Sequence, residues 1–142
     1  MTRGGVDTRG DIRGNGVARH AERFEPFRDY AFAELEAAPL HQAGVCFLPQ
    51  CGRRFDPSVS WQMYCCKACE RAGLTEFRKW GLRAAPALLA WRLGKYASDG
   101  PVADRTRSAR RFVTAVQSAW IVDRADRAKD NQTKQGAENG RN

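Results

Sequence analysis

The pattern of apolar and polar positions along the chain predicts helices on either side of a loop-rich centre. The first predicted helix spans residues 17–38, where apolar side chains recur at helical spacing and Pro39 ends the pattern. Pro26 is compatible with this helix because a first helical turn tolerates proline. The apolar positions of this predicted helix are Phe27, Tyr30, Ala31 and Leu35.

Two short strands joined by a loop are predicted for residues 44–64. Val59, Trp61 and Met63 alternate with polar residues, and a two-residue period is typical of a half-buried strand. Pro57 falls where the chain between the two strands has to turn. We therefore expect a β-hairpin in this part of the chain.

Two helices are predicted directly after the hairpin. The first covers residues 65–83, although Gly73 and Gly81 weaken it because glycine costs about 1 kcal/mol in a helix interior. The second covers residues 86–97 and begins with Pro86.

The clearest helical pattern covers residues 104–124, after a break at residues 99–101. Asp104 suits the N-cap position of this helix. Its apolar residues form one stripe, which is the pattern of a helix that packs on a core. The stripe consists of Ala109, Phe112, Val113, Val116, Ala119 and Trp120.

Both ends of the chain are predicted to be disordered tails. Residues 1–16 are rich in glycine, arginine and aspartate, and residues 125–142 are polar, so neither segment offers much to bury. The sequence therefore predicts a single folded domain over residues 17–124. We find no signal-peptide pattern and no apolar run long enough for a membrane span, and we expect a cytoplasmic protein that does not enter a membrane.

The charge of the chain is strongly asymmetric. The net charge is +8, and residues 67–142 carry 16 basic and eight acidic residues, which accounts for the whole excess. A basic region of this kind suits a nucleic-acid backbone or an acidic protein partner. The basic residues that we predict to contact nucleic acid are Arg71, Arg78, Lys79, Arg83, Arg105, Arg107, Arg110 and Arg111.

Five cysteines gather in a short central segment, at positions 46, 51, 65, 66 and 69. An odd number of clustered cysteines without a signal peptide favours metal binding over a disulfide framework. Zinc takes four ligands at tetrahedral corners, and either Cys65 or Cys66 pairs with Cys69 on one face of a helix. A redox-active pair, an iron–sulfur cluster, free buried thiols and His41 as a ligand are the alternatives that the spacing leaves open.

These motifs resemble small bacterial treble-clef zinc fingers over residues 46–72. The resemblance rests on the Cys51-Gly52 pair, the Pro-containing segment, Tyr64-Cys65 and Cys69. It implies that Cys46, Cys51, Cys65 and Cys69 hold one structural zinc ion, and that residues 44–83 form the finger. The fold expected from the resemblance and the pattern together is α+β: a small treble clef, a β-hairpin plus helix, with one helix before it and two or three after it.

No catalytic constellation accompanies the cysteines. A four-cysteine site leaves no open position for water, and the chain has only two histidines and neither a phosphate-binding loop nor a nucleophile-elbow motif. The sequence therefore predicts a non-enzymatic zinc module that binds DNA or RNA, such as a small transcriptional regulator or a phage-like accessory protein. The alternative is a zinc-stabilised adaptor for another protein, which an exposed apolar stripe around Leu88, Leu89, Trp91 and Leu93 would favour.

Overall fold

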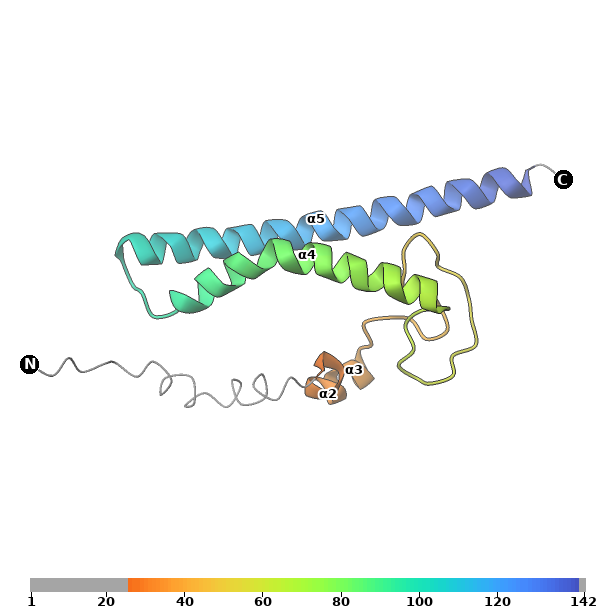
Figure 1. The fold of residues 1–142 in the computed structure, drawn as a ribbon, viewed down its shortest axis with the longest axis horizontal. Coiled ribbons are helices and arrows are strands. Elements are labelled where there is room, and N and C mark those ends of the chain that lie inside the picture. Colours follow the sequence, from red (N-terminus) through yellow and green to blue (C-terminus); the bar gives the residue numbers. More distant parts are fainter. Residues whose placement is uncertain (1–25, 141–142) are drawn as a thin grey trace, which may run out of the picture. The chain divides into compact units, whose positions relative to one another are not determined.

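A computed structural model describes residues 26–140 of the chain, which fall into two compact units divided after Leu40. The first unit contains two short helices, α2 (Phe27–Tyr30) and α3 (Phe32–Ala37). The second unit contains the cysteine-bearing loop and two long helices, α4 (Lys67–Leu93) and α5 (Gly100–Asn139) (Figure 1). The fold is therefore mostly helical.

Helices α4 and α5 form an antiparallel hairpin and share a narrow core (Figure 1). Trp80 of α4 stacks on Trp120 of α5 at 5.9 Å between ring centroids, and Phe77 meets Trp120 edge to face. Ala103, Ala109, Val113 and Val116 are the buried residues of α5. The predicted stripe on this helix is therefore confirmed in part, because Phe112 and Ala119 are exposed.

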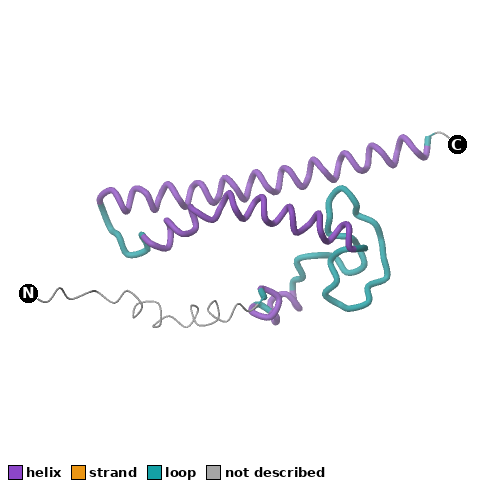
Figure 2. Tube along the Cα trace, in the orientation of Figure 1, coloured by secondary structure: helices purple, strands orange, loops and turns teal. Residues whose placement is uncertain are grey.

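The α+β prediction is wrong, because the structure shows no sheet and no hairpin in residues 26–140. The cysteine-bearing segment is a loop in Figure 2, and its one β pairing is an isolated antiparallel bridge between Val45 and Arg54. The alternating residues 59–63 form a turn instead, in which the Gln62 amide N–H donates to the Val59 carbonyl. Val59 and Trp61 are exposed, and a single short segment without a paired strand cannot bury one face.

The two helices predicted at residues 65–83 and 86–97 are one continuous helix, α4. Pro86 lies inside it rather than at the start of a second helix. Proline removes one helical hydrogen bond and usually kinks the helix, and α4 bends along its length in Figure 1. The helix contacts α5 on both sides of the proline, because Trp80 stacks on Trp120 and Arg110 lies over the Trp91 ring.

Helix α5 begins before and ends after the predicted segment 104–124. It starts at Gly100, so Pro101 occupies its first turn, where proline is well tolerated. It continues to Asn139 through most of the segment 125–142 that the sequence predicts as a disordered tail. Tertiary contacts of its C-terminal half, described below with the metal centre, supply the stability that the local sequence lacks.

The single helix predicted for residues 17–38 is two short helices in the part that the structure describes. α2 and α3 are separated at Ala31 and contain no buried residue. Residues 17–25 and the predicted tail at residues 1–16 lie outside the described residues.

Candidate metal centre

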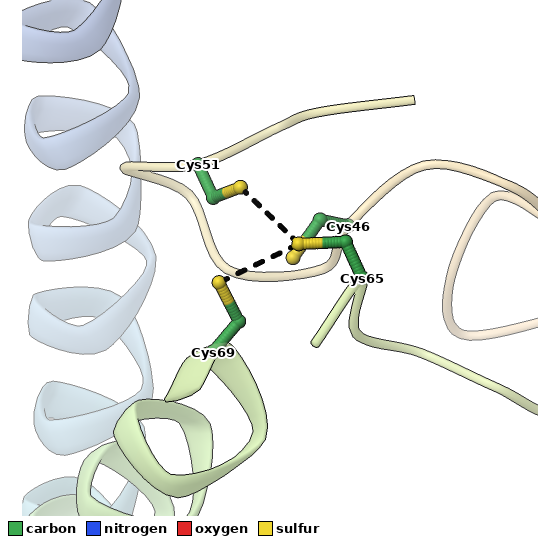
Figure 3. Close-up of side chains that lie close together, drawn as sticks. All are labelled: Cys46, Cys51, Cys65 and Cys69. Carbon is green, nitrogen blue, oxygen red and sulfur yellow. Dashed lines mark hydrogen bonds between the residues drawn. The ribbon is translucent and has the colours of Figure 1, made fainter. Parts of the chain in front are cut away.

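Four cysteine side chains converge at the N-terminal end of α4. Cys46 and Cys51 come from the loop, Cys65 lies two residues before the first residue of the helix, and Cys69 lies in its first turn (Figure 3). Their sulfur atoms all lie within 4.8 Å of one another. The structure thus brings together the four cysteines that the zinc-finger resemblance implies, and they are positioned to bind a metal ion.

The spacing of the sulfur atoms fits tetrahedral zinc. The Cys51 and Cys65 sulfurs are 3.8 Å apart, and those of Cys65 and Cys69 are 3.7 Å apart. A tetrahedron with Zn–S bonds of about 2.3 Å has edges of about 3.8 Å. The two edges therefore match a zinc tetrathiolate, and a disulfide is ruled out for these pairs because its sulfurs lie about 2 Å apart.

A tight turn presents the first two cysteines to the site. The buried Leu48 offers its carbonyl to the amide N–H groups of both Cys51 and Gly52. Gly52 has φ +59°, a left-handed conformation that favours glycine. The amide of Cys46 donates to the Arg53 carbonyl, which closes the turn on its other side.

The crowded thiols have strongly altered acidities. Burial raises the pKa of Cys65 to about 12, and burial together with the neighbouring thiols raises the pKa of Cys69. Burial also acts on Cys51, but a hydrogen bond from the backbone of Arg53 and contacts with the other thiols outweigh it and lower its pKa. A bound divalent cation would reverse the two increases, because metal coordination deprotonates thiols.

The fifth cysteine and the histidine considered as a ligand both lie outside the cluster. Cys66 is exposed and occupies the N-cap position of α4. His41 is not part of the group of metal-ligating side chains found among the described residues. The structure therefore selects Cys65 over Cys66, a choice that helical spacing alone left open.

Three polar side chains from the C-terminal half of α5 hold the cysteine-bearing loop. Arg124 donates to the carbonyl of Phe47 at 2.6 Å and lies over the Phe47 ring. Arg127 donates to the side chain of Gln50 at 2.8 Å. Asn131 donates to the carbonyl of Cys51, a cluster member, at 2.9 Å. The spacing of residues 124, 127 and 131 places them on one face of α5, but no sequence pattern indicates what this face contacts.

A buried carboxylate connects this contact to the helical core. Glu76 of α4 accepts hydrogen bonds from Trp120 at 2.7 Å and from Arg124 at 2.6 Å, and it forms an ion pair with Arg127 at 2.8 Å. Burial alone would raise the pKa of Glu76, but the hydrogen bonds from these three residues outweigh it and lower the pKa. None of the residues that support the cysteine cluster was predicted from the sequence: Glu76, Arg124, Arg127 and Asn131.

The eight basic residues predicted to contact nucleic acid do not form one surface. Arg107, Arg110 and Arg111 share one face of α5 with Thr114 and line a surface hollow of about 420 Å³. Arg105 lies on another side of the same helix, because positions two apart do not face the same way.

The basic residues of α4 point in different directions. Lys79 and Arg83 lie over the buried Trp80 ring, at 5.2 and 4.7 Å from its centroid, so they cover the core. Arg71 and Arg78 share the opposite face of the helix, since seven residues make about two turns.

The fold and the site together define the class of this protein: a long helical hairpin with four cysteines at one end that are positioned to bind a metal ion. No family, no curated protein and no solved structure matches the chain. None of the described helices is long and apolar enough to cross a membrane.

Proposed function

We propose that the chain is a non-enzymatic module in which Cys46, Cys51, Cys65 and Cys69 hold one structural zinc ion. The donor set supports zinc, because four thiolates at these separations suit a closed tetrahedral site. In this role the ion supplies no chemistry. It fixes the loop to the start of α4 and thereby sets the contact between the loop and α5.

We propose further that this module binds nucleic acid through the arginine face of α5, defined as Arg107, Arg110 and Arg111. The observation that supports this function is the hollow lined by these three residues. Arg110 lies over the Trp91 ring and Arg111 donates to Ser108, so both guanidinium groups are held in place. Arg107 pairs with Asp104, an exposed pair that a phosphate can replace at small cost.

A salt titration of nucleic-acid binding tests this function. The zinc-loaded protein is mixed with fluorescent duplex DNA and with RNA, and the affinity is measured at several salt concentrations. We expect the triple variant Arg107→Ala/Arg110→Ala/Arg111→Ala to bind at least about tenfold more weakly, and the slope of log K against log salt to fall by about 2 to 3. The matched control is Arg71→Ala/Arg78→Ala/Arg92→Ala, which removes the same charge from α4. Equal losses in both triples would show that net charge, rather than the hollow, drives binding.

One observation favours a second function, that of a protein adaptor. The apolar stripe named in the sequence analysis is exposed: Leu88 by 49%, Leu89 by 61%, Trp91 by 39% and Leu93 by 67%. Exposed apolar side chains that lie together on a small protein commonly mark an interaction surface, and Leu89 and Leu93 share one face of α4.

A further inference from the structure

The outer face of α4, directed away from α5, combines exposed leucines with unpaired arginines. Leu74, Leu82, Leu89 and Leu93 lie on this face, and their exposed fractions range from 45% to 74%. At about 100° per residue, these positions fall within a stripe opposite the buried Trp80. We call these four residues the leucine stripe.

Arginines interrupt the leucine stripe along the same line of the helix. Arg71 and Arg78 lie on the outer face with the leucines, and Arg92 lies beside Leu89 and Leu93. No carboxylate among the described residues pairs with any of these three arginines. The face therefore carries uncompensated positive charge within an apolar surface.

The acidic residues of α4 cannot neutralise this face. The helix contains six basic residues and only two acidic ones, Glu70 and Glu76. Glu70 pairs with Lys67 at 2.8 Å, and Glu76 is buried against Arg124 and Arg127. An occupant of the face has to supply both apolar side chains and carboxylates.

We propose that the outer face of α4 binds an acidic amphipathic helix of a partner protein, whose apolar side chains pack on the leucine stripe and whose carboxylates pair with Arg71, Arg78 and Arg92. Helix-on-helix recognition through anchors at helical spacing is a common mode of peptide binding. This surface lies outside the arginine face of α5, so the proposal is independent of nucleic-acid binding.

Charge complementarity favours this occupant over the others that an apolar face attracts. A second copy would bring its own arginines against Arg71, Arg78 and Arg92, and like charges across an interface cost several kcal/mol. An anionic membrane favours basic residues at the borders of an apolar face, whereas Arg78 lies between Leu74 and Leu82 on the face itself. A nucleic acid would pair with the arginines but leave the leucine stripe exposed, whereas the apolar side chains of a partner helix would cover it.

Two synthetic peptides of about 20 residues provide the test. Both carry leucines at helical spacing, and they differ only in having glutamates or lysines at the remaining positions. Binding to the zinc-loaded full chain is followed by fluorescence anisotropy. We expect the glutamate peptide to bind at least about tenfold more tightly than the lysine peptide.

Variants of the full chain locate the binding surface. Leu82→Asp/Leu89→Asp should weaken the glutamate peptide at least about tenfold. The matched control Ile121→Asp/Val122→Asp makes the same change at two exposed residues of α5 and should leave binding unchanged. Arg107→Ala/Arg110→Ala/Arg111→Ala should also leave it unchanged, which separates this surface from the proposed nucleic-acid site. Should a leucine variant fail to fold, as judged by circular dichroism, Arg78→Glu replaces it and should shift preference towards the lysine peptide.

Four results would overturn the proposal. They are equal binding of both peptides, equal loss in the leucine and control variants, self-association of the chain that Leu82→Asp/Leu89→Asp abolishes, and binding to phosphatidylserine vesicles with no binding of the glutamate peptide. The third result would assign the face to a second copy, and the fourth would assign it to a membrane.

Discussion

At the scale of single residues, two adjacent cysteines have different roles. Cys65 contributes its sulfur to the cluster, whereas Cys66 is exposed at the N-cap of α4. Helical spacing from Cys69 cannot distinguish them, because positions three and four apart share a face. The distinction depends on where the loop enters the helix.

This difference gives a direct prediction for zinc binding. Cys66→Ser should retain one zinc ion per chain, because its sulfur is not a ligand, and Cys65→Ser should lose zinc or bind it far more weakly. Native mass spectrometry of the purified variants measures the bound metal. Loss of zinc from Cys66→Ser with retention in Cys65→Ser would show that the tetrad is assigned wrongly.

Glu76 should make stability depend on pH in the acidic range. Its pKa is lowered from the ordinary value of 4.5, so the unfolded chain binds the proton more readily. Its contribution to stability is therefore complete above pH 4.5 and is lost as the pH falls further below that value. Urea unfolding followed from pH 6 to 3 should show this loss, at roughly constant ionic strength.

Two variants isolate the contribution of this carboxylate, because protons also displace metal from thiolates. Glu76→Gln should lower the free energy of unfolding near neutral pH by about 3 kcal/mol, since it removes the charged partner of the half-buried Arg124 and leaves Arg127 with Asp123 alone. The pH dependence of this variant should be shallower than that of the unchanged chain. Glu70→Gln alters an exposed pair on the same helix and should cost about 0.5 kcal/mol or less. Parallel pH profiles for the unchanged chain and Glu76→Gln would contradict the prediction.

At the scale of elements, two glycines in α4 differ in their surroundings. A side chain at Gly73 would overlap the ring of Tyr64, which anchors the segment before Cys65. A side chain at Gly81 would meet open space. Both glycines lower helix propensity equally, and both were therefore predicted to weaken the helix. In the structure, Gly73 leaves room for Tyr64, whereas Gly81 makes no such contact.

The paired alanine variants test this difference. Gly73→Ala should lower the free energy of unfolding by about 1–3 kcal/mol, because Tyr64 has to move away from its packing position. Gly81→Ala should raise it by about 0.5–1 kcal/mol, because alanine favours a helix more than glycine does. Chemical denaturation of both variants at saturating zinc measures the two effects, and stabilisation by both substitutions would show that Tyr64 does not pack on Gly73.

At the scale of the whole molecule, the metal centre and the helical hairpin support each other. Arg124, Arg127 and Asn131 bind the cysteine-bearing loop, and Glu76 ties two of them to the Trp80–Trp120 core. The C-terminal half of α5 therefore depends on a loop that lies about 80 residues earlier in the chain.

Removing the metal should consequently affect two distant segments. With a strong chelator, we expect hydrogen exchange to accelerate at residues 44–66 and also at residues 124–131, while residues 103–116 stay more protected through packing on α4. Exchange measured by mass spectrometry with and without chelator distinguishes these segments. An unchanged melting temperature and exchange pattern after complete metal removal would contradict a structural role for the ion.

The sequence by itself was sufficient to predict helical structure over most of α4 and about half of α5, and to predict the four clustered thiols. Apolar residues at helical spacing identify most of the face by which α5 packs, and cysteine spacing in a tight turn and a first helical turn restricts the possible ligands. Both properties are local, because they follow from helix periodicity and from the geometry of a few adjacent residues.

Only the tertiary structure decided where α5 ends and that residues 59–63 form no strand. Each of these outcomes depends on a contact that is distant in sequence. The polar segment after Arg124 is helical because its side chains reach the loop. Val59, Trp61 and Met63 form no sheet because residues 26–140 contain no second strand to pair with them. The local sequence pattern indicates which secondary structure a segment prefers. Strand pairing and burial depend in addition on which other segments of the chain pack against it.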